Sequence, residues 1–365
     1  MKRIIAVILS LITVLSAAAC TPVDTEPSGT VETTGSVNVG DGMKEKMDSA
    51  LQKHGFEGIV YLTQNGKVVY QSATGTDENG NALTVDSTMY IGSMSKQFCA
   101  AAVMMLSEQG KLSVNDTLDA YFPEYSYGKD ITIKNLLSMR SGIPDMASKE
   151  SNSACKVEGV STDKSATENN TLIMEWIFNQ LLEFEPDSTF EYCNSNYFLL
   201  SNIVELASGE SYNDFVRNNI FEPLEMTHTG FISEIKTSPA WSDGLTYDTF
   251  TAGEAAEGLT KGAGDIASNA ADMDKWMTAL SSAKVISIDS YREMVTNYSV
   301  DSAKGYGYGM FVSFFGGVGH SGMIGSYTSL DYINEEQGYN LFATSNKSYM
   351  EIENLPSMLL GDYLD

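Results

Sequence analysis

Ser93 and Lys96 are the residues of this 365-residue chain whose types and spacing point most directly to chemistry. They lie three positions apart, just before an apolar run from Cys99 to Leu106. Residues three apart on a helix are neighbours on its surface, so a helix that begins near Ser93 places the lysine amine against the serine hydroxyl. Such a lysine helps to remove the hydroxyl proton and activates the serine as a nucleophile. The alternative is an N-cap serine followed one turn later by a solvated lysine.

The spacing Ser-x-x-Lys is not specific by itself, because it recurs elsewhere in the chain. Only Ser93 follows Gly92 and a short apolar segment and precedes an apolar helix. The other copies lie in polar or turn-rich stretches: Ser126/Lys129, Ser153/Lys156, Ser161/Lys164, Ser233/Lys236 and Ser281/Lys284.

A second candidate stretch contains Tyr192 and Asn194. A tyrosine near a lysine ammonium has its phenolate form favoured, and a phenolate can act as a general base towards a serine hydroxyl. Taken singly the stretch has an ordinary explanation, since Tyr-x-Asn recurs at Tyr332/Asn334 and lone tyrosines are more often core residues.

A third candidate stretch is His320-Ser321-Gly322-Met323, which precedes a segment typical of a strand. A glycine there permits close approach of the backbone, and the amide that follows it could point into an oxyanion hole. This motif is also unspecific alone, because His-x-Gly recurs at His228/Gly230 and a lone histidine near a turn is more often a surface or capping group.

Taken together, the three motifs resemble the serine β-lactamase and penicillin-binding-protein superfamily, in particular its class C β-lactamase, DD-peptidase and esterase branch. They occur in the family's order, with the third at the place of the family's Lys-Thr-Gly triad. The resemblance covers about Met43 to the C-terminus. Three further segments are similar to family segments: Leu136 to Asp145, Tyr192 to Gly209, and Gly262 to Trp276.

The resemblance implies a role for each motif residue. Ser93 is the nucleophile that accepts the acyl group, Lys96 lowers the proton affinity of its neighbours, and Tyr192 shuttles protons. Asn194 hydrogen-bonds the amide of the substrate, and His320 with Ser321 orients Tyr192 and the carboxylate side of the substrate. Gly322 completes the triad. The backbone amides of Ser93 and Met323 form the oxyanion hole. The family needs no metal or organic cofactor.

Two positions depart from the family's pattern. His320 stands where class C β-lactamases usually carry lysine, whereas histidine is common in DD-peptidases and esterase-like members. A neutral imidazole lacks the fixed positive charge that recruits a β-lactam carboxylate, which favours activities other than efficient β-lactam hydrolysis. Cys193 occupies the middle of the Tyr-x-Asn motif, where the family usually has a small residue, and makes oxidation sensitivity possible.

The charge balance and the N-terminus indicate where the protein works. There are 22 Lys and Arg residues against 48 Asp and Glu, a formal charge of −26 that argues against a nucleic-acid partner.

Residues 1–20 resemble a lipoprotein signal peptide with Cys20 as the lipidated mature N-terminus, although Ala17 stands where such sites usually have Leu. Cleavage after Ala-x-Ala by ordinary signal peptidase is the alternative. We expect export to the outer face of a bacterial membrane.

The other three cysteines are Cys99, Cys155 and Cys193, which permit at most one disulfide and show no metal-ligand spacing. Whether Cys155 and Cys193 pair stays open. Cys99 and Cys193 are expected to be small buried hydrophobic residues.

The order of elements predicts an α+β fold. Residues 21–42 are typical of a flexible tether, and 43–365 form the hydrolase domain with a helical lobe at about 93–250. Asn65-Gly66 indicates a hairpin, and the apolar spacing from Leu172 to Phe184 predicts an amphipathic helix. Strand patterns return at 310–315, 326–333 and 339–344. We therefore expect an antiparallel sheet built from both chain ends, flanked by terminal helices, with an inserted all-helical lobe. Ser93 is expected at the seam between them, where sites are common.

The sequence thus predicts an exported serine hydrolase that attacks an amide or ester carbonyl through an acyl-enzyme, most naturally as a DD-carboxypeptidase or D-amino-acid peptide hydrolase. A β-lactamase and a carboxyl esterase are alternatives within the same chemistry. A non-catalytic lipoprotein that binds penicillin or peptidoglycan is the alternative of another class. The expected partners are a small-molecule or peptide substrate and a membrane reached through the N-terminal lipid, with the protein as a monomer.

Overall fold

The computed structural model describes residues 41–147, 155–161, 163–235, 237, 258–299, 304–349 and 351–361. The chain divides into two units, Met1–Val37 and Asn38–Asp365, and all described residues belong to the second. Cys20 and the predicted signal peptide lie outside the described residues.

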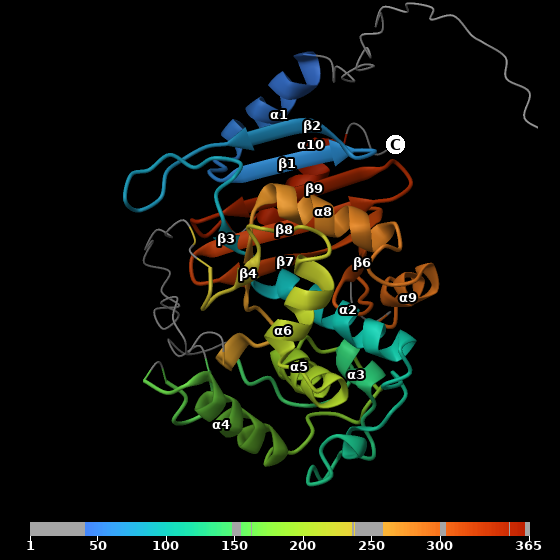
Figure 1. Ribbon diagram of the computed structural model, residues 1–365. Helices are drawn as coiled ribbons and strands as arrows, with labels where there is room; N and C mark the ends of the chain where they lie inside the picture. The colour runs from blue at the N-terminus through green and yellow to red at the C-terminus, as the bar shows by residue number, and fades with distance from the viewer. Residues whose placement is uncertain are drawn as a thin grey trace, which may run out of the picture. The chain divides into compact units, whose positions relative to one another are not determined.

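The largest element of the fold is a six-stranded antiparallel sheet with the strand order β2-β1-β9-β8-β7-β6, in the upper half of Figure 1. The first two strands form the predicted hairpin, in which Asn65 and Gly66 both have positive φ angles, as a tight two-residue turn requires. The strands are β1 (Ile59–Gln64), β2 (Lys67–Ala73), β6 (Phe311–Phe314), β7 (Gly317–Ile324), β8 (Tyr327–Asn334) and β9 (Tyr339–Ser345).

Both ends of the chain build this sheet, because β1 pairs with β9. One face is covered by α1 (Asp41–Lys53) and α10 (Leu355–Leu360), whose apolar residues share a core with Leu330 and Leu341. The other face contacts α8 (Ala270–Ser281), which crosses the sheet in Figure 1. The fold class predicted from the sequence is confirmed.

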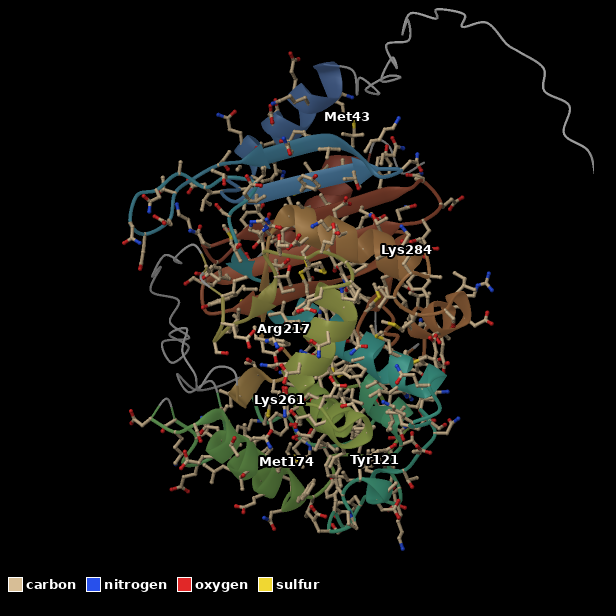
Figure 2. The ribbon with its side chains drawn as sticks, in the orientation of Figure 1. Met43, Tyr121, Met174, Arg217, Lys261 and Lys284 are labelled. Carbon is tan, nitrogen blue, oxygen red and sulfur yellow. The ribbon has the colours of Figure 1, made fainter. Side chains whose placement is uncertain are left out.

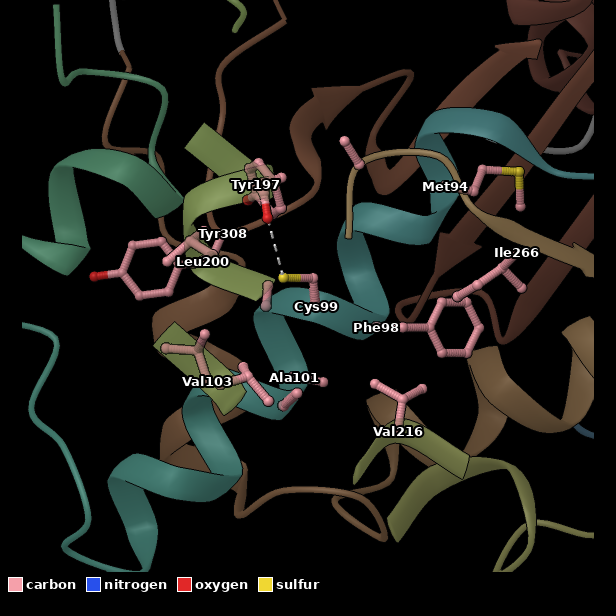
Figure 3. Close-up of a cluster of buried hydrophobic side chains, with 14 of the residues drawn as sticks. Met94, Phe98, Cys99, Ala101, Val103, Tyr197, Leu200, Val216, Ile266 and Tyr308 are labelled. Carbon is pink, nitrogen blue, oxygen red and sulfur yellow. Dashed lines mark hydrogen bonds between the residues drawn. The ribbon is translucent and has the colours of Figure 1, made fainter. Parts of the chain in front are cut away.

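The middle of the chain supplies helices packed around α2 (Ser95–Glu108), which is buried along most of its length. Figure 3 shows Cys99 and Val103 of α2 beside Tyr197 and Leu200 of α5. The surrounding elements are α3 (Ile133–Leu137), α4 (Ala166–Phe178), α5 (Asn194–Ser208), α6 (Tyr212–Val216), the π-helical turn η3 (Arg217–Phe221), α9 (Ile288–Met294) and the 3-10 turn η2 (Leu118–Ala120). A second 3-10 turn, η4 (Ile352–Asn354), leads into α10 and packs against β8.

A small second sheet was not predicted. It joins β3 (Met89–Tyr90), β5 (Ile266–Ser268) and β4 (Gly230–Phe231) in the order β3-β5-β4, and it leads directly into the turn that carries Ser93. Strands of two or three residues are too short to show an alternating pattern. This sheet nevertheless ties the start of α2 to a segment more than 170 positions later.

One sequence boundary was wrong. The helix expected at 172–184 runs from Ala166 to Phe178, because Ser165 and Glu168 form a capping box at its start. The third motif precedes a strand, β8, as expected, and it also lies inside a strand of its own, β7. Cys99 and Cys193 are buried as expected, and Cys99, Cys155 and Cys193 are all free thiols.

Candidate active site

The structure brings Ser93 and Lys96 together at the start of α2. Ser93 lies in the one-turn 3-10 helix η1 (Gly92–Met94), and Lys96 lies in the first turn of α2. The Lys96 Nζ atom donates a hydrogen bond to Ser93 Oγ at 3.1 Å. By contrast, Lys284 of another Ser-x-x-Lys pair is exposed (labelled in Figure 2), and its Ser281 donates to the Met277 carbonyl.

Lys96 is completely buried, and its amine has three acceptors. Besides Ser93 it donates to Asn194 Oδ1 at 2.8 Å and to the Ala263 carbonyl at 2.7 Å. Burial lowers the pKa of Lys96 to about 7, and the negative charge of Asp145 opposes this shift. Near neutral pH a share of the amines is therefore unprotonated. Such an amine keeps two N–H bonds for Asn194 and the Ala263 carbonyl and turns its lone pair to the Ser93 hydroxyl, whose proton it can accept.

Asn194 is held in one orientation by Asp145. The Asn194 backbone amide donates to Asp145 Oδ1 at 3.0 Å, and its side-chain Nδ2 donates to Asp145 Oδ2 at 3.1 Å. With Nδ2 engaged in this way, the amide oxygen must face Lys96. Asp145 thus positions Asn194, and its negative charge also favours the Lys96 ammonium.

The ring of Tyr192 faces the lysine amine, and Lys96 Nζ lies 4.9 Å from the ring centroid. Its hydroxyl is buried and makes no hydrogen bond of ordinary geometry within the described residues. Burial raises the pKa of the Tyr192 phenol well above its ordinary value, although the nearby Ser93 side chain lowers it. The expectation that the lysine favours a phenolate is therefore wrong for this site, and Tyr192 carries its proton.

His320 faces the same pocket and is neutral. Its ring lies 5.9 Å from the Tyr192 ring, between centroids. Its Nδ1 lies 2.5 Å from the Ser321 carbonyl, which can only accept, so Nδ1 carries the proton and Nε2 accepts from the Tyr306 hydroxyl at 3.1 Å. Burial lowers the pKa of His320 to about 3, and the charges of Lys96 and Lys304 act in the same direction.

A buried polar network holds the strand that carries His320. The His320 backbone amide donates to Asp331 Oδ1 at 2.7 Å, and Gln97 Nε2 donates to both Asp331 oxygens at 2.8 Å. Trp276 Nε1 in turn donates to Gln97 Oε1 at 2.9 Å. Gln97 follows Lys96 in α2, so this network fixes β7 relative to the helix that carries Lys96.

The backbone around Gly92 and Gly322 leaves space for an oxyanion hole. Gly92 has φ +51, and a Cβ atom there would lie 2.8 Å from the Met323 nitrogen. A Cβ atom on Gly322 would lie 1.9 Å from the Ile91 carbonyl oxygen. The two glycines therefore allow β7 to approach η1 closely, which brings the backbone of Met323 beside the turn that carries Ser93.

Ser321 does not join Tyr192. Alternate residues of a strand face opposite sides, so His320 and Gly322 face η1 while Ser321 faces the other way. Its Oγ donates to Glu353 Oε1 at 2.5 Å, and Glu353 also pairs with Lys304. The Ser321 side chain is thus engaged with Glu353 and does not contact Tyr192 in the way the resemblance implied, whereas the His320 ring lies beside the Tyr192 ring.

Sequence reasoning did not assign roles to Asp145, Tyr306, Asp331 or Glu353. A signal existed for one of them, since Asp331 interrupts the otherwise apolar and hydroxyl-bearing strand β8. For the others only the fold brings the residue to the site.

The described residues contain no group of three or more His, Cys, Asp or Glu side chains that could hold a metal ion. Among those same residues, no helix has the length and apolar character needed to cross a membrane.

A family model and several known proteins match this chain. The family model described as Beta-lactamase matches residues 43–360. PbpX of Bacillus subtilis (strain 168), which is assigned as a penicillin-binding protein, is 32% identical over 277 residues, covering 74% of this chain and 65% of that protein. The chain spans less than two thirds of the length of the curated relatives first matched, at 65%, 42% and 36%.

Solved structures share the fold. The D-amino acid amidase from Ochrobactrum anthropi SV3, in complex with D-phenylalanine, has a TM-score of 0.73 at 22% identity, with 88% of this chain and 98% of that chain covered. The octameric penicillin-binding protein homologue from Pyrococcus abyssi has a TM-score of 0.69 at 24% identity, with 88% and 77% covered.

Proposed function

The chain belongs to the beta-lactamase family, within the serine β-lactamase and penicillin-binding-protein superfamily, and on that premise we propose that it is a serine hydrolase that forms an acyl-enzyme on Ser93. The observation that carries the proposal is the hydrogen bond between Lys96 Nζ and Ser93 Oγ, made by an amine whose pKa is about 7. An amine with that pKa exchanges protons readily at neutral pH.

Each step of acylation has a residue at hand. The neutral Lys96 amine takes the proton of Ser93 while Oγ bonds to the substrate carbonyl carbon. The amides of Ser93 and Met323 stabilise the resulting oxyanion. The carbon–nitrogen or carbon–oxygen bond then breaks, Tyr192 gives its proton to the departing atom, and the lysine returns a proton to Tyr192. In deacylation a water molecule takes the place of the leaving group and the same transfers run in reverse.

We place the substrates among D-amino-acid amides and D-amino-acid peptides, including DD-carboxypeptidase substrates. Two relatives support this class: a penicillin-binding protein and a D-amino acid amidase. The neutral state of His320 supports it further, because the third motif then lacks the cation that would attract a β-lactam carboxylate.

A substrate panel tests this function. Purified protein comprising residues 43–365 is assayed with D- and L-phenylalaninamide, an acylated D-Ala-D-Ala peptide, a chromogenic cephalosporin and p-nitrophenyl acetate. We expect D-amides or D-peptides to be hydrolysed at least about tenfold faster than the L-amide, since a fixed oxyanion hole discriminates between enantiomers. Preferred hydrolysis of the cephalosporin or the acetate ester would replace the proposed substrate class. Penicillin binding without any hydrolysis would overturn the enzyme proposal.

We also propose that the protein is exported and anchored through lipid on Cys20. The support is the basic and apolar N-terminal segment that ends at this cysteine. Full-length protein produced in a bacterium and labelled with a palmitate analogue should carry the label and partition into detergent, whereas Cys20→Ala should do neither. Unlabelled protein released into the medium would indicate ordinary signal-peptidase cleavage instead.

A further inference from the structure

We propose, on the basis of the serine hydrolase function above, that Met139 is a positioning residue that aims the Tyr192 hydroxyl at the leaving group. Met139 follows α3 and is completely buried. It acts through the backbone on both sides of Tyr192. Its effect should therefore appear in the step in which Tyr192 donates its proton.

Met139 occupies a backbone position that glycine usually fills, because α3 ends in a Schellman motif. The Met139 amide donates to the Leu136 carbonyl at 3.2 Å, and the next amide, that of Arg140, donates to the Asn135 carbonyl at 2.8 Å. Met139 has the left-handed φ of +60 that this motif requires. A residue with a side chain is strained in that conformation and persists there only where surrounding contacts hold it. The methionine side chain therefore makes contacts that a glycine could not make.

These contacts are hydrogen bonds to the second motif and to the start of α5. The Met139 sulfur accepts from the Cys193 backbone amide at 3.4 Å and from Asn196 Nδ2 at 3.6 Å. The Met139 carbonyl accepts from the Glu191 amide at 3.0 Å. A thioether is a weak acceptor, but both of its donors belong to buried residues, where an unsatisfied N–H is costly. One residue thus anchors the chain immediately before and immediately after Tyr192.

Cys193 transmits this anchoring to the tyrosine. It is extended, with φ −144 and ψ 117, so its side chain faces the opposite way from that of Tyr192. The Cys193 thiol donates to the Ile143 carbonyl at 3.2 Å, whereas the Tyr192 ring faces Lys96. The segment that contains Met139 and Ile143 therefore holds Cys193 from behind and fixes the direction in which the Tyr192 side chain leaves the backbone.

The Tyr192 hydroxyl depends on this backbone for its position. It makes no hydrogen bond of ordinary geometry within the described residues. The ring packs against the Tyr306 and His320 rings, at 6.2 and 5.9 Å between centroids. Such packing does not fix how far the hydroxyl reaches towards the departing atom, so the backbone anchors set that distance. A misplacement of about 1 Å can cost about a hundredfold in rate.

The experiment compares two esters of D-phenylalanine that share the acyl group and differ in the leaving group. Methoxide needs the Tyr192 proton as it departs, whereas p-nitrophenolate is stable as an anion and does not. The readout is the ratio of kcat/KM for the p-nitrophenyl ester to kcat/KM for the methyl ester, with spontaneous hydrolysis subtracted. Met139→Leu keeps an apolar side chain of similar volume and loses the sulfur acceptor, so we expect this ratio to rise about tenfold. A loss of folded protein lowers both kcat/KM values together and leaves the ratio unchanged.

Two further variants test whether the sulfur acceptor is responsible. Met139→Gln places an amide oxygen on a side chain of similar length, and should hold the ratio within about threefold of the wild-type value. Met277→Leu, the matched control, makes the same exchange at a completely buried methionine of α8 and should not move the ratio. An equal rise in Met277→Leu, or a ratio in Met139→Gln as high as in Met139→Leu, would overturn the positioning role.

A double variant tests whether Met139 acts through Tyr192. Tyr192→Phe removes the proton donor and should raise the ratio at least as far as Met139→Leu does. Met139→Leu added to Tyr192→Phe should raise the ratio no further, because a donor that is absent cannot be misplaced. A further rise in the double variant contradicts the proposal.

The outcomes separate the positioning role from the proposed function. If the wild-type protein hydrolyses the esters but the ratio is unchanged in Met139→Leu, Met139 is a structural residue only and the hydrolase proposal stands. If the wild-type protein hydrolyses neither ester nor any member of the substrate panel, the proposed function itself has failed, and the positioning role fails with it.

Discussion

Replacement of Ser93 by alanine is expected to reduce turnover of every substrate by at least about a thousandfold, because it removes the only oxygen that can bond to the acyl carbon. Folding should survive, since Ser93 is half-buried, lies in the one-turn helix η1 and is not part of the apolar core. Steady-state kinetics and thermal unfolding of Ser93→Ala measure the two effects separately.

Ser126→Ala is the matched control for this change. Ser126 has the same spacing to Lys129 as Ser93 has to Lys96, but it is exposed and lies outside the site. Its replacement should leave kcat/KM at the wild-type value. Equal loss of activity in both variants, or retained turnover in pure Ser93→Ala protein, is incompatible with Ser93 as nucleophile.

The pH dependence should report the ionisation of Lys96. Only the neutral amine accepts the Ser93 proton, so kcat/KM should rise about tenfold per pH unit below pH 7 and level off above the Lys96 pKa of about 7. Lys96→Met keeps an apolar side chain of similar length in a fully buried position. It should lower kcat/KM by about a thousandfold and abolish the rise of kcat/KM with pH, which is the acid limb of the profile. His320, with a pKa of about 3, should contribute no limb between pH 5 and 9.

Asp145→Asn should move the limb to lower pH. The Asp145 carboxylate stabilises the Lys96 ammonium and raises the pKa of the lysine, so removal of the charge lowers that pKa. An amide at position 145 has one oxygen and one NH2 group, so it accepts less well from Asn194 Nδ2 than the carboxylate does. The Asn194 oxygen is then held less firmly against Lys96. Asp187→Asn, at a carboxylate 76% exposed, is the matched control and should leave the limb in place. An unmoved limb in Asp145→Asn would show that another group titrates.

Local patterns were sufficient to predict much of the fold. Asn65-Gly66 predicted the hairpin because few other residue pairs accept two positive φ angles, and the apolar run after Lys96 predicted a buried helix. The short strands β3, β4 and β5 could not be predicted, since their pairing depends on residues far apart in the chain. The start of α4 was missed because the capping box at Ser165 precedes its first strongly apolar residues.

The site was predictable where its chemistry is local and unpredictable where it depends on packing. Ser93 and Lys96 lie one turn apart, so their spacing alone indicated contact. Tyr192 was correctly placed near Lys96, but its protonation follows from burial, which the sequence does not display. The hydrogen bond between Ser321 and Glu353 joins a strand to a later turn, and only the assembled sheet brings the two together.

The most direct test of the central claim is intact-mass analysis after reaction of residues 43–365 with a neutral fluorophosphonate, followed by peptide mapping. The phosphorus of this probe bonds to an activated serine oxygen with loss of fluoride, so the adduct reports the nucleophile whatever the natural substrate is. We predict a single adduct on the peptide that contains Ser93, formed faster as pH rises through 7 and absent from Ser93→Ala. An adduct on another residue, or one that persists in Ser93→Ala, would contradict the account.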